Sequence, residues 1–357
     1  MAIVVYFLSS IALLVVVKLT YNIYFHPLAS YSGPLYLIAS DIPLAVLPLL
    51  GTSQYLLKAA HDKYGDIVRI APGTLSYIKP QAWSNIYGYK PNGGDVANFP
   101  KDPHFYNEMM LGRQTITLAS DEEAIPIRRS LNSAFSHRSL LEQETMMQQC
   151  SQMVQLFYLS NEVIEAQATV VILADSETSS VAETAAVYRI LTHPDIYKKL
   201  RKEIRSSFAS IENIKLQDVL YKLPYLEAVV QETLRIHAPL ANGFTRWVPE
   251  KNGAIICGQH VPQGTVVTIN HYCSNTSESN FRDPMSFIPE RWMGDATYTN
   301  DKREVVQPFF VGPRNCPGQQ FALYIIKLTL AHLIWRFDLE LGEGTKNWAE
   351  GQRIYNG

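Results

Sequence analysis

Apolar residues fill the first part of the chain. Residues 3–17 are apolar except for two serines, and Lys18 closes the run. A helix that spans a bilayer needs about 20 such residues, and the apolar and aromatic residues up to Phe25 extend the run to that length. A cleaved signal peptide and a buried core helix are the alternatives, but the run has no basic leader, no clean cleavage site and no amphipathic packing face. We expect a single-pass anchor over residues 1–25, with the rest of the chain in the cytosol.

The next stretch of the sequence is rich in proline. Pro27, Pro34, Pro43 and Pro48 each lack the backbone N–H that a helix interior needs. We interpret residues 26–52 as an irregular linker between the anchor and a domain over residues 53–357.

Helical patterns outnumber strand patterns in this domain. Residues 53–64 have helical periodicity, and residues 67–78 predict a short hairpin around a Pro-Gly turn. The apolar run 170–174 fits a buried helix, and helical signals dominate residues 182–236. Strand-like pieces follow at residues 244–248, 254–257 and 266–269, and a long helix is expected at 319–336. The predicted fold class is therefore mainly α with small β-sheets.

Composition narrows the range of partners. The formal net charge is −2, and the basic residues are scattered, so nucleic acid is not an expected partner. The cysteines Cys150, Cys257, Cys273 and Cys316 lie far apart in the sequence, which predicts neither a disulfide scaffold nor a zinc site. A reducing compartment is the simpler interpretation.

One cysteine has a distinctive setting. Cys316 lies on a loop rich in glycine and proline, immediately before the helix expected to begin near Gln319. A helix N-terminus favours a thiolate over a thiol, and Arg314 adds positive charge. A thiolate ligand pushes electron density onto haem iron and favours O–O cleavage. The alternative is a buried cysteine that acts as a small apolar residue.

The residues of this loop carry a family resemblance. Phe309, Gly312, Arg314, Cys316 and Gly318 match the haem-binding signature of the cytochrome P450 family position for position. The resemblance implies that Cys316 ligates the iron of haem b (heme b), with Phe309, Gly312 and Arg314 among the residues that bind the cofactor.

Two further segments resemble the same family. Glu232 and Arg235 lie three residues apart in a predicted helix and share one face, and Arg291 lies in a Pro-Glu-Arg-Trp segment that resembles the family's PERF or PERW segment. The resemblance implies a structural Glu-Arg-Arg cluster that holds the loop leading to the haem cysteine. Such a cluster must be fully paired if it is buried.

The oxygen-activating helix of the family has a weaker counterpart. Residues 174–179 resemble the A-G-x-[DE]-T-[TS] pattern, with Asp175 where glycine is usual. The resemblance implies that Thr178 and Glu177 deliver protons to bound dioxygen, which is general acid catalysis. A solvated helix end is the alternative for this segment.

Cations are expected at the two haem propionates. Arg246 matches the family position in the segment after the Glu-Arg pair, and Arg128 matches the one in an earlier helix. Ala124 replaces the usual aromatic residue or histidine, and Pro126 lies inside the same helix. A surface arginine is the alternative for Arg128.

The resemblance covers nearly the whole chain, yet one interval is short. Between Phe135 and Ala174 the chain has room for about two helices, where the family has several that form the roof over the substrate. The sequence also stops at Gly357, before the hairpin that usually lines the substrate pocket. We therefore expect a cytochrome P450 fold that lacks part of its helical roof. A genuine deletion and a mis-assembled coding sequence are both compatible with this gap.

The resemblance is to fungal microsomal P450s, and it implies a function. The expected activity is an NADPH-dependent monooxygenation of a lipophilic small molecule, as in terpenoid or polyketide tailoring in secondary metabolism. Electrons would come from a membrane-bound NADPH–P450 reductase, and the chain would reside in the endoplasmic reticulum membrane. A non-catalytic, membrane-anchored remnant is one alternative, and a P450-type isomerase or dehydratase is another.

Overall fold

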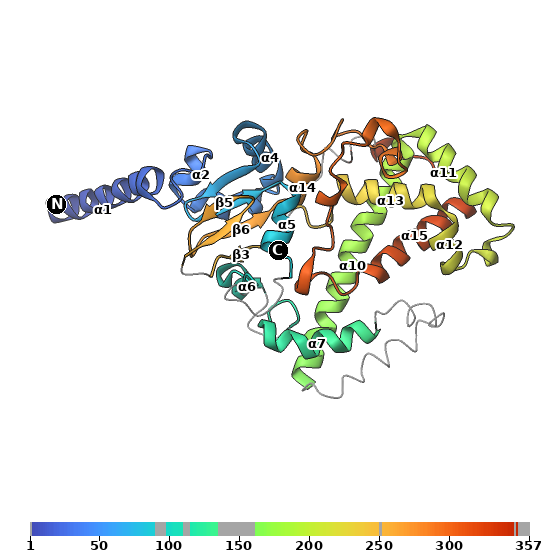
Figure 1. Cartoon of the computed structure of the whole chain (residues 1–357), viewed down its shortest axis with the longest axis horizontal. Helices are drawn as coiled ribbons and strands as arrows, with labels where there is room; N and C mark the ends of the chain where they lie inside the picture. Colours follow the sequence, from blue (N-terminus) through green and yellow to red (C-terminus); the bar gives the residue numbers. More distant parts are fainter. Residues whose placement is uncertain are drawn as a thin grey trace. The chain divides into compact units, whose positions relative to one another are not determined.

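The computed structural model describes residues 2–89, 98–109, 115–134, 161–249, 252–345 and 348. The chain divides into two compact units (Figure 1). Among the described residues, the first holds the chain up to Asp102 together with Ala241–Asn280, and the second holds Pro103–Leu240 and the described part of Phe281–Gln352.

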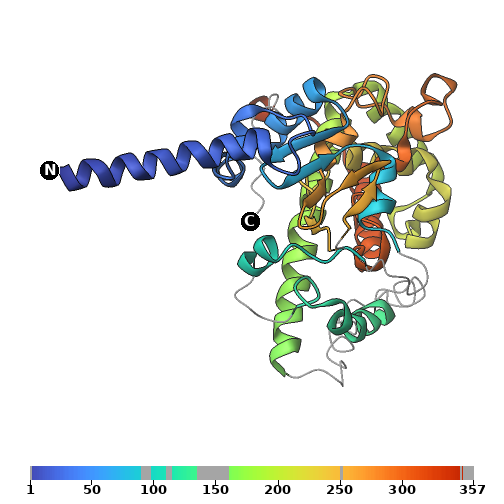
Figure 2. The same ribbon diagram turned by 60° about the vertical axis from the view of Figure 1, so that its left-hand side comes forward.

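The first unit begins with the apolar helix. Helix α1 spans Ala2–Thr20 and continues as a π-helical turn, η1, over Tyr21–Phe25. The helical stretch Ala2–Phe25 is long and apolar enough to cross a membrane, and the protein buries none of its most apolar part. It projects from the first unit in Figure 2. These features fit the expected anchor.

The Pro-rich stretch differs from the expected irregular linker, because it forms short helices. These are α2 (Leu35–Ala39), α3 (Ile42–Val46) and the 3-10 turn η2 (Leu47–Leu50). Pro43 and Pro48 lie in the first turns of α3 and η2. A first-turn backbone N–H has no intrahelical partner, so proline begins a helix there instead of breaking it.

A four-stranded sheet forms the centre of the first unit. Its order is β1-β2-β6-β3, with β2 and β6 parallel and the other pairs antiparallel. The predicted hairpin is β1 and β2, and β4 and β5 form a separate two-stranded sheet. The strands are β1 (Ile67–Ala71), β2 (Thr74–Tyr77), β3 (Arg246–Trp247), β4 (Ala254–Ile256), β5 (Gln259–Val261) and β6 (Val266–Ile269), and the remaining helices are α4 (Ser53–Tyr64), α5 (Pro80–Ile86) and α14 (His271–Asn275).

The second unit is helical. Its longer helices in the described part of the chain are α6 (Pro103–Met109), α7 (Asp121–Ala134), α10 (Asn161–Thr192), α11 (Pro194–Ser207), α12 (Leu216–Lys222), α13 (Pro224–Ile236) and α15 (Gln319–Arg336). Helices α10, α13 and α15 contact one another around one apolar core. The prediction of a mainly α fold with small sheets is confirmed.

One packing prediction is wrong. The apolar run 170–174 is helical, as expected, but the side chains described in it are not buried: Ile172 is 67% exposed, Ala174 is also exposed, and Val170 is half-buried. Within the described ranges, no element covers this face of α10. Residues 135–160, which contain Cys150 and most of the interval expected to be short, lie outside the described residues, as does the chain end after Trp348.

Candidate functional site

A tight loop presents Cys316 at the start of α15. The backbone φ is +59° at Phe310 and +77° at Gly312, which turns the chain sharply and uses the left-handed freedom of glycine at the second position. The N–H of Cys316 donates to the carbonyl of Phe309 at 2.8 Å, and the N–H of Asn315 donates to that of Gly312 at 3.2 Å. These bonds fix the backbone of Cys316, which lies two residues before Gly318.

Opposing effects act on the pKa of the Cys316 thiol. The residue reaches solvent, yet the protein around the thiol still desolvates it and raises its pKa, while the backbone N–H of Gly318 and the charge of Arg128 act to lower that pKa. A metal cation bound at sulfur replaces the thiol proton outright. An accessible sulfur at a helix N-terminus, with a backbone donor and a cation nearby, therefore fits an anionic ligand to haem iron.

Arg128 and Arg314 both form hydrogen bonds between the cysteine loop and the region around α7. Arg128 donates from Nη1 to the Asn315 carbonyl at 2.8 Å and from Nη2 to the Asn315 side-chain oxygen. Arg314 donates from Nη2 to the Ala119 carbonyl at 3.0 Å. The structure thus brings Arg128 of α7 together with Arg314 and Cys316. Contact of either arginine with a propionate stays a prediction.

A capping box sets the start of α7 and so the position of Arg128. The N–H of Glu123 donates to the Ser120 hydroxyl at 3.3 Å, and the N–H of Ser120 donates to the Glu123 carboxylate at 2.9 Å. The two residues satisfy each other's backbone donors, as the S-x-x-E sequence permits. The helix then continues through Pro126 to Ala134.

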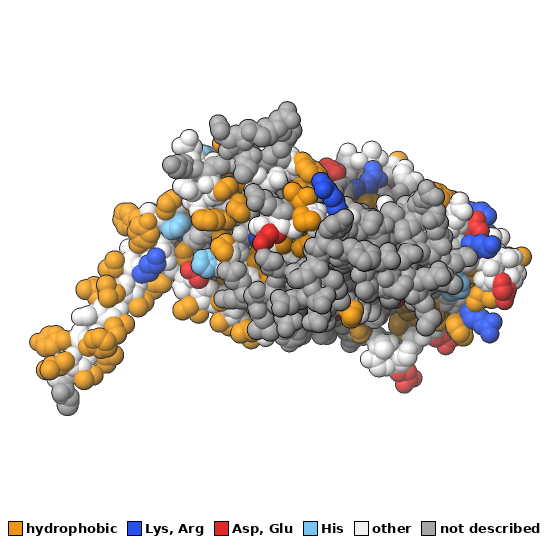
Figure 3. Space-filling model, turned by 90° about the horizontal axis from the view of Figure 1, so that it is seen from below, with side chains coloured by type: hydrophobic (Ala, Val, Ile, Leu, Met, Phe, Trp, Pro, Cys, Tyr) orange, Lys and Arg blue, Asp and Glu red, His pale blue; other side chains and the backbone are white. Residues whose placement is uncertain are grey.

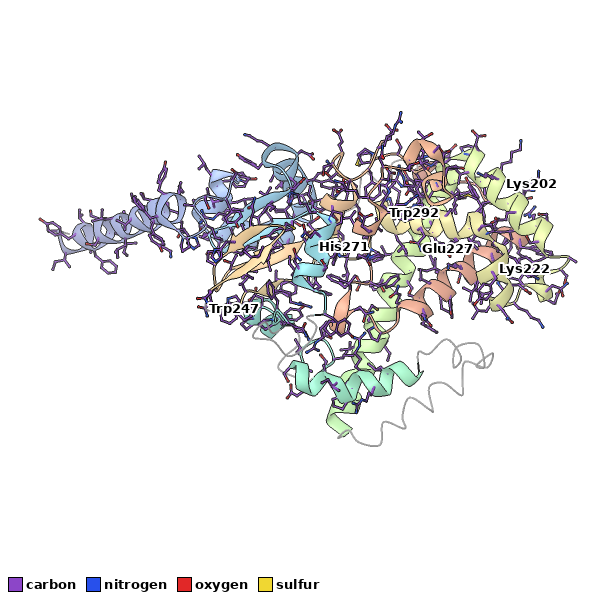
Figure 4. All side chains as sticks on the ribbon, viewed as in Figure 1. Lys202, Lys222, Glu227, Trp247, His271 and Trp292 are labelled. Atoms are coloured by element: carbon purple, nitrogen blue, oxygen red, sulfur yellow. The ribbon has the colours of Figure 1, made fainter. Side chains whose placement is uncertain are left out.

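Glu232, Arg235 and Arg291 lie together in the core of the second unit. Arg235 donates two hydrogen bonds of 2.8 Å to the Glu232 carboxylate, and Arg291 donates one of 3.0 Å. The indole N–H of Trp292, labelled in Figure 4, donates to the same carboxylate at 2.9 Å. The three charged side chains have no exposed surface, so each depends on its partners.

The sequence did not reveal a fourth charged member of this cluster. Asp301 accepts from Nη1 of Arg291 and, at 2.8 Å, from the backbone N–H of Arg282. Its side chain is 2% exposed. With Asp301 the cluster has two carboxylates for two guanidinium groups, which balances its charge. No fixed spacing marks this aspartate, because an irregular segment of the chain brings it to Arg291.

Phe309 connects the cysteine loop to the same core. It packs against the apolar cluster formed by α10, α13 and α15. Through Glu232 the cluster ties α13 to the 3-10 turn η4 (Pro289–Trp292). The chain from η4 to Phe309 is therefore held at both ends.

Helix α10 carries the two expected proton-delivery residues. The Thr178 hydroxyl donates to the Ala174 carbonyl of its own helix at 2.5 Å and is half-buried, and Glu177 is exposed. The structure brings α10 against α15, the helix that follows Cys316 (Figure 1). The side chain of Asp175 lies outside the described residues.

Arg246 belongs to the first unit, whereas the cysteine loop belongs to the second. It is 5% exposed, donates to the Thr245 carbonyl at 3.0 Å and lies 5.1 Å from the centre of the Tyr87 ring. The Tyr87 hydroxyl donates in turn to the Phe244 carbonyl at 2.5 Å. The role of Arg246 at a propionate stays a prediction.

Comparison with known proteins gives one consistent family. The family model for cytochrome P450 matches residues 145–353. Cytochrome P450 monooxygenase astD of Aspergillus oryzae is 31% identical over 94% of this chain and 88% of its own length. Cytochrome P450 monooxygenase atr2 of Stereocaulon alpinum is 27% identical over 92% of this chain and 88% of its own length.

The length of these alignments bears on the deletion expected between Phe135 and Ala174. The alignment with the Aspergillus protein extends over 455 positions, more than the 357 residues of this chain. The relative therefore contains residues that have no counterpart here, in agreement with the expected deletion. Both the matched family model and the similarity over most of the chain lead to the same conclusion: this chain belongs to the cytochrome P450 family.

Proposed function

We propose that this chain is a haem–thiolate monooxygenase in which Cys316 ligates the iron. The observation that carries this proposal is the geometry of the cysteine loop. Its sulfur is accessible, it precedes an 18-residue helix, and Arg128 binds the residue next to it. A thiolate on iron favours cleavage of the O–O bond, which is the chemistry that a bound haem would supply.

The other site residues have supporting roles in this proposal. Phe309 and Gly312 shape the surface against which the cofactor would lie. Arg314, Arg246 and Arg128 are the cations that would hold the propionates. Thr178 and Glu177 would move protons toward the reacting oxygen, since a hydroxyl and a carboxylate together form a proton path.

The family and the apolar helix α1 support a proposal for the substrate class and the partners. We infer a lipophilic small molecule as substrate, and the fungal relatives support a role in secondary metabolism such as terpenoid or polyketide tailoring. NADPH would supply electrons through a membrane-bound P450 reductase. Helix α1 would hold the chain in the endoplasmic reticulum membrane, with the rest of it in the cytosol.

A second candidate, a non-catalytic membrane-anchored remnant, is favoured by the exposed face of α10. Ile172 is 67% exposed, and the relatives contain residues that this chain lacks. An apolar surface that loses its cover favours aggregation or loose folding. On this basis we expect haem occupancy below one per chain.

Turnover separates the two candidates. The full chain is reconstituted with NADPH and a fungal P450 reductase, and oxidation of a panel of lipophilic compounds is measured. The monooxygenase proposal predicts product from the wild type, none from Cys316→Ala, and undiminished product from the control Cys257→Ala. Haem-loaded protein that oxidises none of the panel while consuming no NADPH would favour the remnant.

A further inference from the structure

The start of helix α13 has no capping side chain of its own. Leu223 occupies the N-cap position without a side-chain acceptor, and Pro224 after it has no backbone N–H. The N–H of Glu227 donates to the Leu223 carbonyl at 3.1 Å. The N–H groups of Tyr225 and Leu226 are therefore the donors of the first turn that need an acceptor from outside the helix.

Glu203 of α11 supplies both acceptors. Its Oε1 accepts from the N–H of Tyr225 at 2.8 Å, and its Oε2 accepts from the N–H of Leu226 at 2.9 Å. A carboxylate at a helix N-terminus forms charge-assisted hydrogen bonds and is favoured by the helix dipole. Glu203 is thus the cap of α13, although it belongs to another helix.

Helix α11 turns one side to solvent and the other to the apolar core. Lys198 and Lys202 are exposed, and Figure 3 shows Lys, Arg, Asp and Glu side chains on the surface of the second unit, at the right of the view. Leu200 and Ile204 are buried in the apolar cluster of this unit. Glu203 precedes Ile204 and is half-buried, so its carboxylate reaches α13 where the solvated charges of α11 do not.

The two capped residues belong to the core that supports the cysteine loop. The side chains of Tyr225 and Leu226 are 2% and 0% exposed, and they are part of the apolar cluster against which Phe309 packs. The carbonyl of Phe309 accepts from the N–H of Cys316 at 2.8 Å. Glu203 is therefore connected to Cys316 through one packed core.

The start of α13 also binds the turn η4. The Tyr225 hydroxyl donates to the Glu290 carboxylate at 3.0 Å, and Nζ of Lys199 donates to the same oxygen at 2.8 Å. Burial and the nearby carboxylates raise the pKa of Tyr225, so its hydroxyl stays protonated and donates. The side chains of Lys199 and Glu290 are 50% and 34% exposed, and such a pair contributes little to stability. The Glu203 cap is the stronger connection between α11 and α13.

We propose that Glu203 is a positioning residue for the cysteine loop, which it acts on by holding the first turn of α13 in place. The proposal rests on the proposed role of Cys316 as the iron ligand. Without this carboxylate, two buried N–H groups lose their acceptors, and the first turn of α13 opens more often. Phe309 then loses part of the surface against which it packs, and Cys316 is held less firmly.

Amide hydrogen exchange of the full chain in detergent micelles tests this proposal without relying on activity. Mass spectrometry with electron-transfer fragmentation resolves single residues. Glu203→Ala should speed exchange about tenfold at Tyr225 and Leu226 and also at Cys316. The control Asp195→Ala, which removes an exposed acid of the same helix, should leave all three rates unchanged. Faster exchange at Tyr225 and Leu226 alone would overturn the proposal, because the cap would then have no effect on the loop.

A milder variant and a spectroscopic measurement complete the test. Glu203→Gln keeps one acceptor oxygen, so it should fold even if Glu203→Ala does not, with a smaller increase in exchange at Cys316. In haem-loaded protein, the fraction of haem with a thiolate-type Soret band in the reduced carbon monoxide spectrum should fall from wild type to Glu203→Gln to Glu203→Ala. Equal fractions in the three proteins would contradict the proposal. If the wild type lacks the band, the proposed function fails, and exchange at Cys316 still decides the role of Glu203.

Discussion

At the scale of single residues, the surroundings of Cys316 act on the pKa of its thiol in opposing directions. Burial raises the pKa of its thiol, and the Gly318 N–H and Arg128 offset this only in part. The residue nevertheless reaches solvent, and the Gly318 N–H and Arg128 favour its anionic form. A metal cation bound at the sulfur would replace the thiol proton.

The buried charge cluster leads to a stability prediction. Asp301→Asn removes the carboxylate that balances Arg291 and should lower the free energy of unfolding by about 3–5 kcal/mol. Asp338→Asn is the control, because Asp338 also pairs with arginines, Arg201 and Arg205, but is 68% exposed. An exposed pair contributes about 0–1 kcal/mol. Urea unfolding measures both variants, and losses of equal size would contradict the assigned role of Asp301.

Buried histidines predict acid sensitivity. Burial lowers the pKa of His61 to about 4, from an ordinary value near 6.5. Between these pH values the unfolded chain binds a proton at this residue and the folded chain does not, so stability is greatest above pH ~6.5 and falls as the pH approaches 4. His61 should account for a loss of about 3 kcal/mol over that range.

The measurement is the unfolding midpoint in urea from pH 7 to pH 5. His61→Gln should flatten this pH dependence, although it weakens bonds to the Gly65 carbonyl and the Ser76 hydroxyl. His260, which is exposed, supplies the control substitution His260→Gln. If the pH profile of His61→Gln matched that of the wild type, burial of a neutral imidazole would not explain the acid sensitivity.

Sequence reasoning found the residues that local signatures mark. Cys316, Glu232, Arg235 and Arg291 each belong to a short motif, and the structure brings the last three together. Asp301 was missed because its contact depends on the path of an irregular segment, for which no periodicity exists. The bond from Arg128 to Asn315 was missed for the same reason, since 187 residues separate its partners.

At the scale of elements, hydrophobic periodicity located the hairpin and the long C-terminal helix. The strands β1 and β2 and the helix α15 lie where the pattern placed them. The helices α2, α3 and η2 were not expected, because proline was read as a helix breaker although it lies in the first turn of two of them. The predicted burial is wrong for Ile172 and Ala174, because an apolar run shows that a helix can bury a face, not that another element is present to cover it.

The packing of the segment before α2 against β1 gives an element-scale prediction. A Cβ at Gly33 would lie 2.0 Å from the carbonyl oxygen of Arg69, so Gly33→Ala must push the segment away from the strand. We expect a loss of about 2–3 kcal/mol, visible as a lower thermal midpoint. Gly73→Ala is the matched control in the turn that joins β1 and β2, where a Cβ would meet nothing within 4 Å. A loss no larger for Gly33→Ala than for the control would argue against this close contact.

At the scale of the whole molecule, the chain belongs to the family and yet lacks residues that its relatives contain. The second unit holds the cysteine loop, its supporting cluster and α10 together, while the relatives contain residues with no counterpart here. The 67% exposure of Ile172 on α10 is consistent with this difference. We therefore expect a site that can ligate haem in a protein that retains it incompletely.

The occupancy prediction can be tested directly on purified protein. The ratio of haem, measured as the pyridine haemochrome, to polypeptide should be below one for the wild type. Added haem should raise the ratio only partly, because an exposed apolar surface favours aggregation or loose folding. A ratio of one in freshly purified protein would contradict this expectation.

The central claim is that Cys316 is a thiolate ligand to haem iron. The most direct measurement is the carbon monoxide difference spectrum of the reduced full chain, compared with that of Cys316→Ala and the control Cys257→Ala. The wild type and the control should show a thiolate-type Soret band, in proportion to their haem content, and Cys316→Ala should lack it. A thiolate-type band that persists in Cys316→Ala, or its absence from haem-loaded wild type, would contradict the claim.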